Sequence, residues 1–233
     1  MNTNGRIDAP SRRAKGPVGR PRDLTLPGRR HEEILEAATR LFAEKGFHGT
    51  DLEEVAARIG VAKGTLYRYF PSKRALFLAA VDRGMRAMID ELQARAAEAT
   101  DPLDGVERAV RAYLTFFRDH PEVVELLILE RAEFKDRAKP SYFVHRDRAV
   151  GPWLEVARGL VEAGRIRSIS PEGICDLVSN LLYGTLFTNH FEGTGDIDRQ
   201  VAEIRDLLLF GVLSDAERAG FRAAEGDKGA RHG

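Results

Sequence analysis

Hydrophobic residues recur every three to four positions along most of this chain, which is the spacing of one helix face. Convincing runs that alternate apolar and polar residues between tight turns, as strands do, are missing. Glycines and prolines fall where helices end and begin. The pattern therefore predicts an all-α protein of about nine helices, near residues 30–45, 51–58, 63–69, 73–98, 102–119, 121–135, 141–163, 171–192 and 197–213.

Three of these helices are short and closely spaced, between residues 30 and 70. Gly46 ends the first, whose apolar stripe is made of Ile34, Ala38, Leu41 and Phe42. Thr50 and Glu53 have the spacing of a capping box, so the second helix is expected to begin at Asp51. Gly60 provides a short turn into the third helix, and such a turn sets two helices at a steep angle. The pattern predicts a helix-turn-helix that places one helix in a major groove of DNA.

The third of these helices, residues 63–69, has an unusual outward surface for its length. Leu66 and Phe70 lie four positions apart and are expected to face the core. The residues left to face DNA are Lys63, Thr65, Tyr67, Arg68 and Tyr69. Their hydroxyls and cations suit phosphate oxygens and guanine edges, and Gly64 lets the backbone approach the groove floor. Ser72 is expected to cap the next helix and place Lys73 beside the same phosphates.

A series of motifs runs in order through residues 34–76: Ile34-Leu35-Glu36-Ala37-Ala38, Leu41-Phe42, Gly46-Phe47, Thr50, Val55-Ala56, Gly60-Val61, Gly64-Thr65-Leu66-Tyr67, Tyr69-Phe70 and Ser72-Lys73. This series resembles the DNA-binding domain of the TetR (tetracycline repressor) family. The resemblance implies that phosphates or base edges are contacted by Thr65, Tyr67, Tyr69 and Lys73. It also implies that Lys63 and Gly64 read bases and that Thr50 caps the supporting helix. Ala62 and Arg74 depart from the residues common in relatives, so the caps and phosphate contacts there are expected to differ.

Charge is unevenly distributed, although Lys plus Arg and Asp plus Glu each total 36. Residues 1–30 carry eight basic and two acidic residues, a net charge of +6, and residues 31–83 carry eight of each sign. The rest of the chain holds 20 basic and 26 acidic residues, a net charge of −6. A basic front and an acidic rear suit a protein that points one end at phosphate. A cationic tail that raises non-specific DNA affinity is favoured over minor-groove reading by Arg20 and Arg22.

Cysteine usage and hydropathy indicate the compartment. Cys175 is the only cysteine, so a reducing, cytoplasmic setting is expected, and a buried thiol is favoured over a redox sensor. The basic N-terminus lacks the apolar stretch of a secretory signal, and apolar runs fall short of the roughly 20 residues that span a bilayer. The expected organisation is a flexible tail over 1–28, a DNA-binding domain over 29–83, a ligand-binding and dimerisation domain over 84–213 and a polar tail over 214–233.

Two segments behind the DNA-binding region are apolar around much of their circumference. The first begins at Ile174 and ends at Phe191, and the second begins at Ile197 and ends at Leu213. A helix of this kind must be covered on two sides. Packing against the same helices of a second copy covers both, which is also how the resembled family dimerises. We therefore expect a homodimer on a palindromic operator, with Gly184 allowing close approach of the helices.

The resemblance further implies a sensor pocket enclosed by the middle helices. Its expected lining is apolar with a few polar groups, namely Phe116, Phe117, Leu126, Phe134, Trp153, Asn180, Tyr183, Phe187 and His190. Taken singly, each of these residues is more readily interpreted as core packing. The expected effector is a small, largely apolar molecule that releases a repressor from operator DNA. The helix over 73–98 is expected to be the only continuous rigid connection between the two domains.

Two other functions compete with this interpretation. One is a helical enzyme or small-molecule carrier with a degenerate DNA-binding head, which the intact DNA-facing residues disfavour. The other is a sequence-tolerant architectural protein, which the acidic rear disfavours. Nucleophile motifs, phosphate-binding loops and paired catalytic carboxylates are not found in the sequence, and His145, His190 and Glu192 lack the tight spacing of a metal site. The sequence thus predicts a transcriptional regulator without cofactor or metal.

Overall fold

The computed structural model describes residues 26–193 and 195–211, and in these residues every regular element is a helix. Ten helices follow one another along the described chain: α1 (Leu26–Gly49), α2 (Leu52–Arg58), α3 (Lys63–Tyr69), α4 (Lys73–Ala97), α5 (Pro102–Asp119), α6 (Pro121–Glu133), α7 (Ser141–Ala149), α8 (Gly151–Glu162), α9 (Pro171–Glu192) and α10 (Ile197–Phe210). The predicted all-α class is confirmed. Across these ten helices, the length and hydropathy that a bilayer span requires do not occur together.

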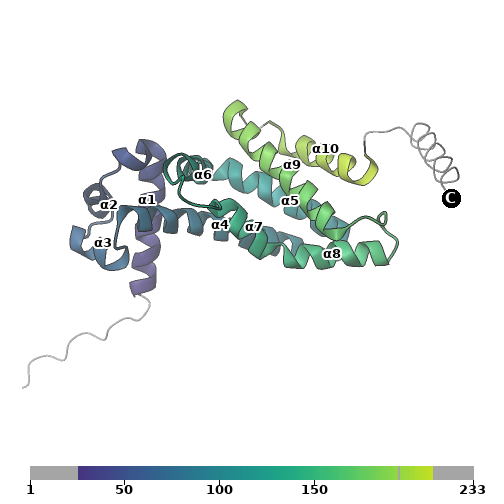
Figure 1. Ribbon diagram of the computed structural model, residues 1–233, viewed down its shortest axis with the longest axis horizontal. Coiled ribbons are helices and arrows are strands. Elements are labelled where there is room, and N and C mark those ends of the chain that lie inside the picture. The colour runs from purple at the N-terminus through teal and green to yellow at the C-terminus, as the bar shows by residue number, and fades with distance from the viewer. Residues whose placement is uncertain (1–25, 194, 212–233) are drawn as a thin grey trace, which may run out of the picture.

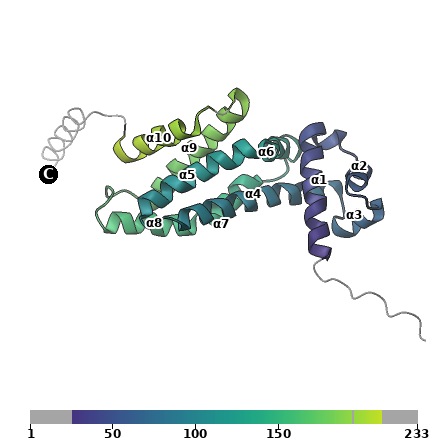
Figure 2. The ribbon, with the colours of Figure 1, turned by 180° about the vertical axis from the view of Figure 1, so that it is seen from behind.

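The helices form a head and a body, which Figures 1 and 2 show from opposite sides. The head, at one end of the molecule, contains α1, α2 and α3. α4 starts in the head and continues into the body, where it packs along α5. In the body α9 packs against α5 and α8, and α10 lies on α5. The elongated arrangement places α8 at the end of the molecule opposite α3, while α9 runs back from α8 to α6 beside the head (Figure 1).

A continuous apolar core holds the head together. Phe42 of α1, Val55 of α2, Leu66 of α3 and Phe77 of α4 are all fully buried. The rings of Phe42 and Phe77 meet edge to face with 5.0 Å between their centroids, a favourable arrangement for aromatic pairs. Gly46 has a φ of +72° and interrupts the regular dihedral angles of α1, as the sequence predicts. One side chain from each helix thus meets at a common centre.

Three helix boundaries differ from the expectation. The single helix expected over residues 141–163 is two helices, α7 and α8, which meet at Val150. Pro152 lies in the first turn of α8, where its missing N–H breaks no hydrogen bond, whereas in mid-helix its ring would clash with the preceding turn. α1 begins at Leu26, inside the segment expected to be a tail, and α10 ends at Phe210, where Gly211 has a φ of +72°. The remainder of both expected tails lies outside the described residues.

The head and the body also meet through α6. Phe134, which follows α6, packs against the ring of Phe47 at 5.0 Å and that of Phe77 at 5.3 Å, measured between centroids. His48 Nε2 lies 2.7 Å from a carboxylate oxygen of Glu133. The expectation that the fourth helix is the only rigid connection is therefore wrong, because α6 packs directly on α1.

Candidate DNA-binding surface and internal cavity

α2, α3 and the turn between them form the helix-turn-helix. Asp51 caps α2, because its carboxylate accepts a hydrogen bond of 2.8 Å from the backbone N–H of Glu53. Gly60 in the turn has a φ of +66°, a conformation that residues with a Cβ rarely adopt. A Cβ built on Gly60 meets nothing within 4 Å, so backbone conformation and not space favours glycine here. The turn presents α3 at the outer end of the head (Figure 1).

Thr50 has a different role from the one expected. Its side chain is 2% exposed, and its hydroxyl lies 2.8 Å from the carbonyl oxygen of Gly46 and 3.1 Å from that of Leu41. These contacts join the end of α1 to the start of α2. The expected capping box with Glu53 is wrong, since Asp51 provides the cap one residue later. Thr50 therefore positions the helix-turn-helix from inside the head, and its hydroxyl does not face DNA.

α3 buries one side and exposes the other. Leu66 and Phe70 are 0% and 4% exposed, as predicted. Tyr67 is 44% exposed. The rest of the outward surface consists of the exposed Lys63, Gly64 and Arg68 and the half-buried Thr65 and Tyr69. Five of the six α3 residues expected to contact DNA thus lie on the outward side, whereas Tyr69 also packs against the core of the head. The DNA contacts themselves stay predictions.

Lys63 is held by a carboxylate of the preceding helix. Its Nζ lies 2.5 Å from Oε1 of Glu53, and this hydrogen bond raises the pKa of the Lys63 ammonium group. Both side chains are well exposed, so the pair stabilises the fold little and can be exchanged for a DNA partner. Glu53 therefore orients Lys63 while competing with DNA for its charge.

The first turn of α4 brings a second cation beside α3. The Ser72 hydroxyl caps α4 by accepting a hydrogen bond of 3.1 Å from the N–H of Ala75, which confirms the expected cap. Lys73 Nζ donates to the carbonyl oxygen of His48 at 3.1 Å and lies 5.0 Å from the centre of the Phe47 ring. Lys73 is thus fixed against the end of α1 instead of extending freely into solvent.

Arg74, which departs from the family pattern, faces the body. Its guanidinium lies 2.6 Å from a carboxylate oxygen of Asp136 and 4.8 Å from the centre of the Phe134 ring. The hydrogen bond from Arg74 holds the pKa of the Asp136 carboxyl below its usual value. The residue that follows a predicted DNA contact therefore joins α4 to the segment after α6.

A cavity of about 1160 Å³ lies in the body between α4, α5, α7, α8, α9 and the end of α10. This is slightly above the range of about 300–1,000 Å³ that is usual for small-molecule sites. Its wall is mainly aliphatic, with Met85 and Met88 on the side of α4. Three arginines line it, and Asp and Glu are absent from the described residues that form its wall. The space is therefore apolar with a positive bias.

The three arginines occupy two places. Arg165 and Arg167 lie between α8 and α9, and Arg165 Nη1 is 2.7 Å from Asp101, the residue that caps α5. The guanidinium of Arg167 has no hydrogen-bond or ion-pair partner in the described part of the chain. Arg146 lies on α7, 3.1 Å from a carboxylate oxygen of Asp147. Of the three arginines, Arg167 is the one without a carboxylate partner among the described residues, so the uncompensated positive charge lies at the α8–α9 end.

Two tyrosines form a polar part of the wall. The hydroxyl oxygens of Tyr113 on α5 and Tyr142 on α7 are 3.0 Å apart, and the two residues are 3% and 5% exposed. Burial raises the pKa of Tyr113 well above its usual value and that of Tyr142 to about 12. Both hydroxyls therefore keep their protons at neutral pH.

The structure corrects most of the expected pocket lining. Of the nine residues, Trp153 lines the large cavity. Six lie outside both cavities described here: Phe116, Leu126, Phe134, Asn180, Tyr183 and Phe187. Leu126 is fully buried in the core, Asn180 is exposed, and Phe134 packs at the junction with the head. Apolar periodicity identifies a buried side chain, but it does not tell whether a neighbour or a void lies opposite.

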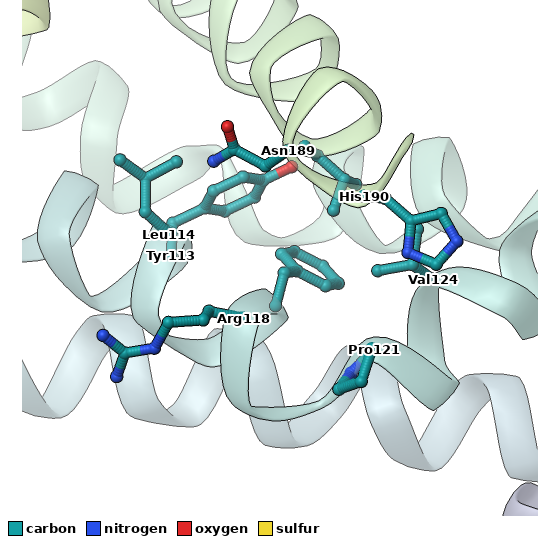
Figure 3. A pocket seen from close by; sticks show the side chains of 9 residues that line it. Tyr113, Leu114, Arg118, Pro121, Val124, Asn189 and His190 are labelled. Carbon is teal, nitrogen blue, oxygen red and sulfur yellow. The ribbon is translucent and has the colours of Figure 1, made fainter. Parts of the chain in front are cut away.

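Phe117 and His190 line a second cavity of about 90 Å³ between α5, α6 and α9. Figure 3 shows Asn189 and His190 on one side of it and Arg118 and Pro121 on the other. A volume of this size has room for about three waters. His190 pairs with the carboxylate of Glu125 at 2.8 Å, and His145 pairs with that of Asp82 at 2.8 Å. The two histidines therefore each have one carboxylate partner, on different sides of the body.

Sequence reasoning missed most of the residues that surround the large cavity. Two signals could have found some of them: the methionines at 85 and 88, one helical turn apart, and the basic pair Arg165 and Arg167 within an acidic domain. Methionine adapts to irregular spaces, so a pair on one helix face is typical of a binding surface. Cys175, expected to be a buried thiol, is half-buried and lines the same cavity.

Comparisons with known proteins agree with this architecture. The family model "Bacterial regulatory proteins, tetR family" matches residues 34–80. The transcriptional regulator RutR of Escherichia coli is 29% identical over 145 residues, which are 62% of this chain and 68% of RutR. The solved TetR family regulator PfmR of Thermus thermophilus has a TM-score of 0.60 at 22% identity, covering 78% of this chain and 99% of PfmR. FadR of Bacillus subtilis, solved in complex with stearoyl-CoA, has a TM-score of 0.62 at 16% identity, covering 78% of this chain and 100% of FadR.

The head, the body and these likenesses together define a helix-turn-helix transcriptional regulator. Residues 34–80 are a DNA-binding domain of the TetR type, and the ten described helices have the fold of solved regulators of that family. The matched family model and the curated relative RutR are both described as transcriptional regulators, which favours regulation over the alternative of a helical enzyme.

Proposed function

We propose that this protein is a dimeric repressor, released from a palindromic operator when a small effector binds in the cavity of about 1160 Å³. The observation that carries the proposal is the position of α4. Lys73 is in its first turn beside α3, and Met85 and Met88 on the same helix form part of the cavity wall. A ligand that displaces α4 therefore also displaces α3, the helix expected to contact DNA bases.

The exposed apolar side chains of α9 support a dimer. Leu177 and Phe191 are 69% and 71% exposed and lie outside the wall of the cavity, whereas the exposed Leu208 and Leu209 on α10 line it. Large exposed apolar surfaces favour association. A Cβ added to Gly184 on α9 meets nothing within 4 Å, which leaves space for a helix of a second copy. In a symmetric dimer the two heads then read half-sites about 34–36 Å apart.

A single charge on this surface tests the dimer. Leu177→Glu places a carboxylate in the proposed interface, so we expect sedimentation to show monomers and operator affinity to fall sharply. Ala94→Glu, at an exposed position of α4, is the matched control and leaves the dimer intact. A dimer that withstands Leu177→Glu would place the interface elsewhere.

The effector that fits the cavity is an elongated molecule with an apolar body and one anionic end. Arg165 and Arg167 supply positive charge at the α8–α9 end, and described acidic residues are absent from the wall. Arg165 is tied to Asp101 at the start of α5, and Tyr113 follows twelve residues later, about 18 Å further along the helix. The complex of FadR with stearoyl-CoA supports an acyl chain as the apolar body.

Coupling between the two sites has two structural routes, α4 and the packing of α6 on α1. Arg86→Pro at an exposed position of α4 breaks the helix where its cavity-lining stretch begins, next to Met85. We expect this variant to bind effector but to respond to it less in operator affinity, with the remaining response carried by α6. Calorimetry with and without operator measures the coupling, which must be reciprocal. A response of full wild-type size would exclude α4 as a route.

Operator capture tests the function as a whole. Genomic fragments retained by the full-length protein in excess competitor DNA are expected to share one palindrome, and hexadecanoate or its thioester is expected to release them. Lys63→Ala serves as the control that loses sequence selection but keeps the fold, since Lys63 is exposed. Retention of random fragments would overturn sequence-specific regulation, and tighter binding with the acyl probe would overturn release.

A further inference from the structure

The tyrosine pair in the cavity wall holds a hydrogen-bond donor that has no acceptor in the described part of the chain. The hydroxyls of Tyr113 and Tyr142 carry two protons, and one hydrogen bond of 3.0 Å between them uses one proton. Neither hydroxyl has another hydrogen-bond partner among the described residues. Whichever tyrosine donates to the other, the second proton is left over.

Both hydroxyls belong to residues of the large cavity's wall, and Tyr113 also borders the small cavity. The exposures of the two tyrosines, 3% and 5%, show how little of either side chain reaches solvent. Because burial raises the pKa of both hydroxyls, they act as donors and not as anions at neutral pH. A buried donor without an acceptor destabilises a fold, so such groups are rare unless a bound molecule satisfies them.

We propose that the effector carries a neutral acceptor oxygen, such as a ketone carbonyl, at the inner end of its apolar chain, and that the tyrosine pair donates its remaining proton to this oxygen. The proposal rests on the proposed function and adds a second polar group to the ligand. The acceptor is neutral because Arg146, the cavity arginine next to Tyr142 on α7, is already paired with Asp147. A carboxylate in this place would be buried without a free cation, which is costly.

The geometry sets the spacing of the two ligand groups. The anionic end lies beside Arg167, whose guanidinium is unpaired among the described residues and which is two residues from Arg165, next to the start of α5; the acceptor oxygen lies at Tyr113 on α5. These positions are about 18 Å apart along the helix axis. The ligand is thus a chain with a charged oxygen group at one end and a neutral one near the other.

Two probes that differ in one group test the inference. Hexadecanoate and 15-oxohexadecanoate have the same length and the same carboxylate, and the second has a ketone next to its far end, at the spacing that the two sites require. Calorimetry on the full-length wild-type protein is expected to give about tenfold tighter binding of the oxo probe, the ratio that one net hydrogen bond produces.

Two variants assign the preference to the tyrosines. Tyr113→Phe/Tyr142→Phe removes both hydroxyls together, so no single hydroxyl is left without its partner, and is expected to bind the two probes equally. Tyr183→Phe is the control: the Tyr183 ring touches that of Tyr142 with 4.5 Å between centroids, but Tyr183 does not line the cavity. It is expected to keep the tenfold ratio.

The outcomes separate this inference from the proposed function. Equal binding of both probes to the wild type would overturn the inference alone and would mean that a trapped water satisfies the hydroxyl. A preference that persists in the double variant would overturn the role of the tyrosine pair. Binding of neither probe would overturn the anionic-chain effector and the inference with it. If the double variant does not fold, the ratio measured on the wild type still decides.

Discussion

The head and the body of this protein use their interiors in opposite ways. In the head, side chains such as Phe42 and Leu66 are fully buried against one another, whereas the body surrounds a cavity of about 1160 Å³. Close packing makes a structure stiff, which a helix needs in order to present fixed contacts to DNA. A sensor instead needs space whose filling changes the arrangement of its walls. The difference indicates that recognition of DNA depends on rigidity and the effector response on incomplete packing.

Tyrosines in the two regions illustrate the same contrast. Tyr67 on α3 is 44% exposed at the surface, whereas Tyr113 is 3% exposed and lines the cavity. The first suits a phosphate oxygen that arrives from solvent, and the second suits a ligand that excludes solvent. One residue type therefore has two functions that only burial distinguishes.

The largest expected effect is on the free energy of unfolding, and it compares a leucine removed from the head with a leucine removed from the body. Leu66→Ala leaves a closed void in the head and is expected to destabilise the fold by about 2–5 kcal/mol and to abolish operator binding. Leu182→Ala borders a cavity that already exists, so it opens no new void and is expected to cost clearly less. Urea denaturation measures both values. Equal losses would show that the body is packed as tightly as the head around these sites.

The next effect distinguishes an α3 residue expected to contact bases from one expected to contact phosphates. Lys63→Ala is expected to lower the ratio of operator to random-DNA affinity about tenfold or more, while Tyr67→Ala weakens binding to both DNAs alike. Glu53→Gln should strengthen binding to both, because it frees Lys63 and removes a negative charge facing DNA. Fluorescence titrations with both DNAs give these ratios. If Lys63→Ala weakens binding to operator and to random DNA by the same factor, Lys63 does not read bases.

A smaller effect is expected from the basic segment before the head. Residues 1–25 carry six basic and two acidic side chains, and deleting them leaves α1 intact from Leu26. We expect a moderate loss of affinity and a shallower dependence on salt, since fewer counterions are released from DNA. Titrations across a salt series measure the slope. An unchanged slope would show that this segment does not touch DNA.

The smallest effect concerns the contact between head and body at Asp136. The hydrogen bond from Arg74 lowers the pKa of the Asp136 carboxyl, so its stabilisation is present above the ordinary carboxyl pKa and is lost as pH falls through the lowered value. Asp136→Asn is expected to lower the Tm slightly at neutral pH and to melt like the wild type in strong acid. Asp90→Asn, on the exposed surface of α4 and without an ion pair in the described structure, is the control. A gap between Asp136→Asn and wild type that stays constant with pH would contradict this contribution.

Local sequence features were sufficient to predict the helices and the helix-turn-helix. Apolar spacing predicted Leu66 and Phe70 to be buried, and Ser72 was predicted to cap α4, because these features depend on residues within one turn of each other. The wrong prediction in the same region, the cap of α2, also concerns neighbouring residues. The cap of α2 moved from Thr50 to Asp51, since both residue types cap helices and only the fold decides which hydroxyl or carboxylate is free.

Only the tertiary structure decided what lies opposite each buried face in the body. Phe134 and Trp153 look alike in the sequence, yet Phe134 fills the junction with the head and Trp153 faces the cavity. Tyr113 and Tyr142 are 29 positions apart, and nothing in their local sequence predicts that their hydroxyls meet. The physical reason is that helical periodicity reports burial, whereas a cavity is a property of how several helices pack together, which no single helix encodes.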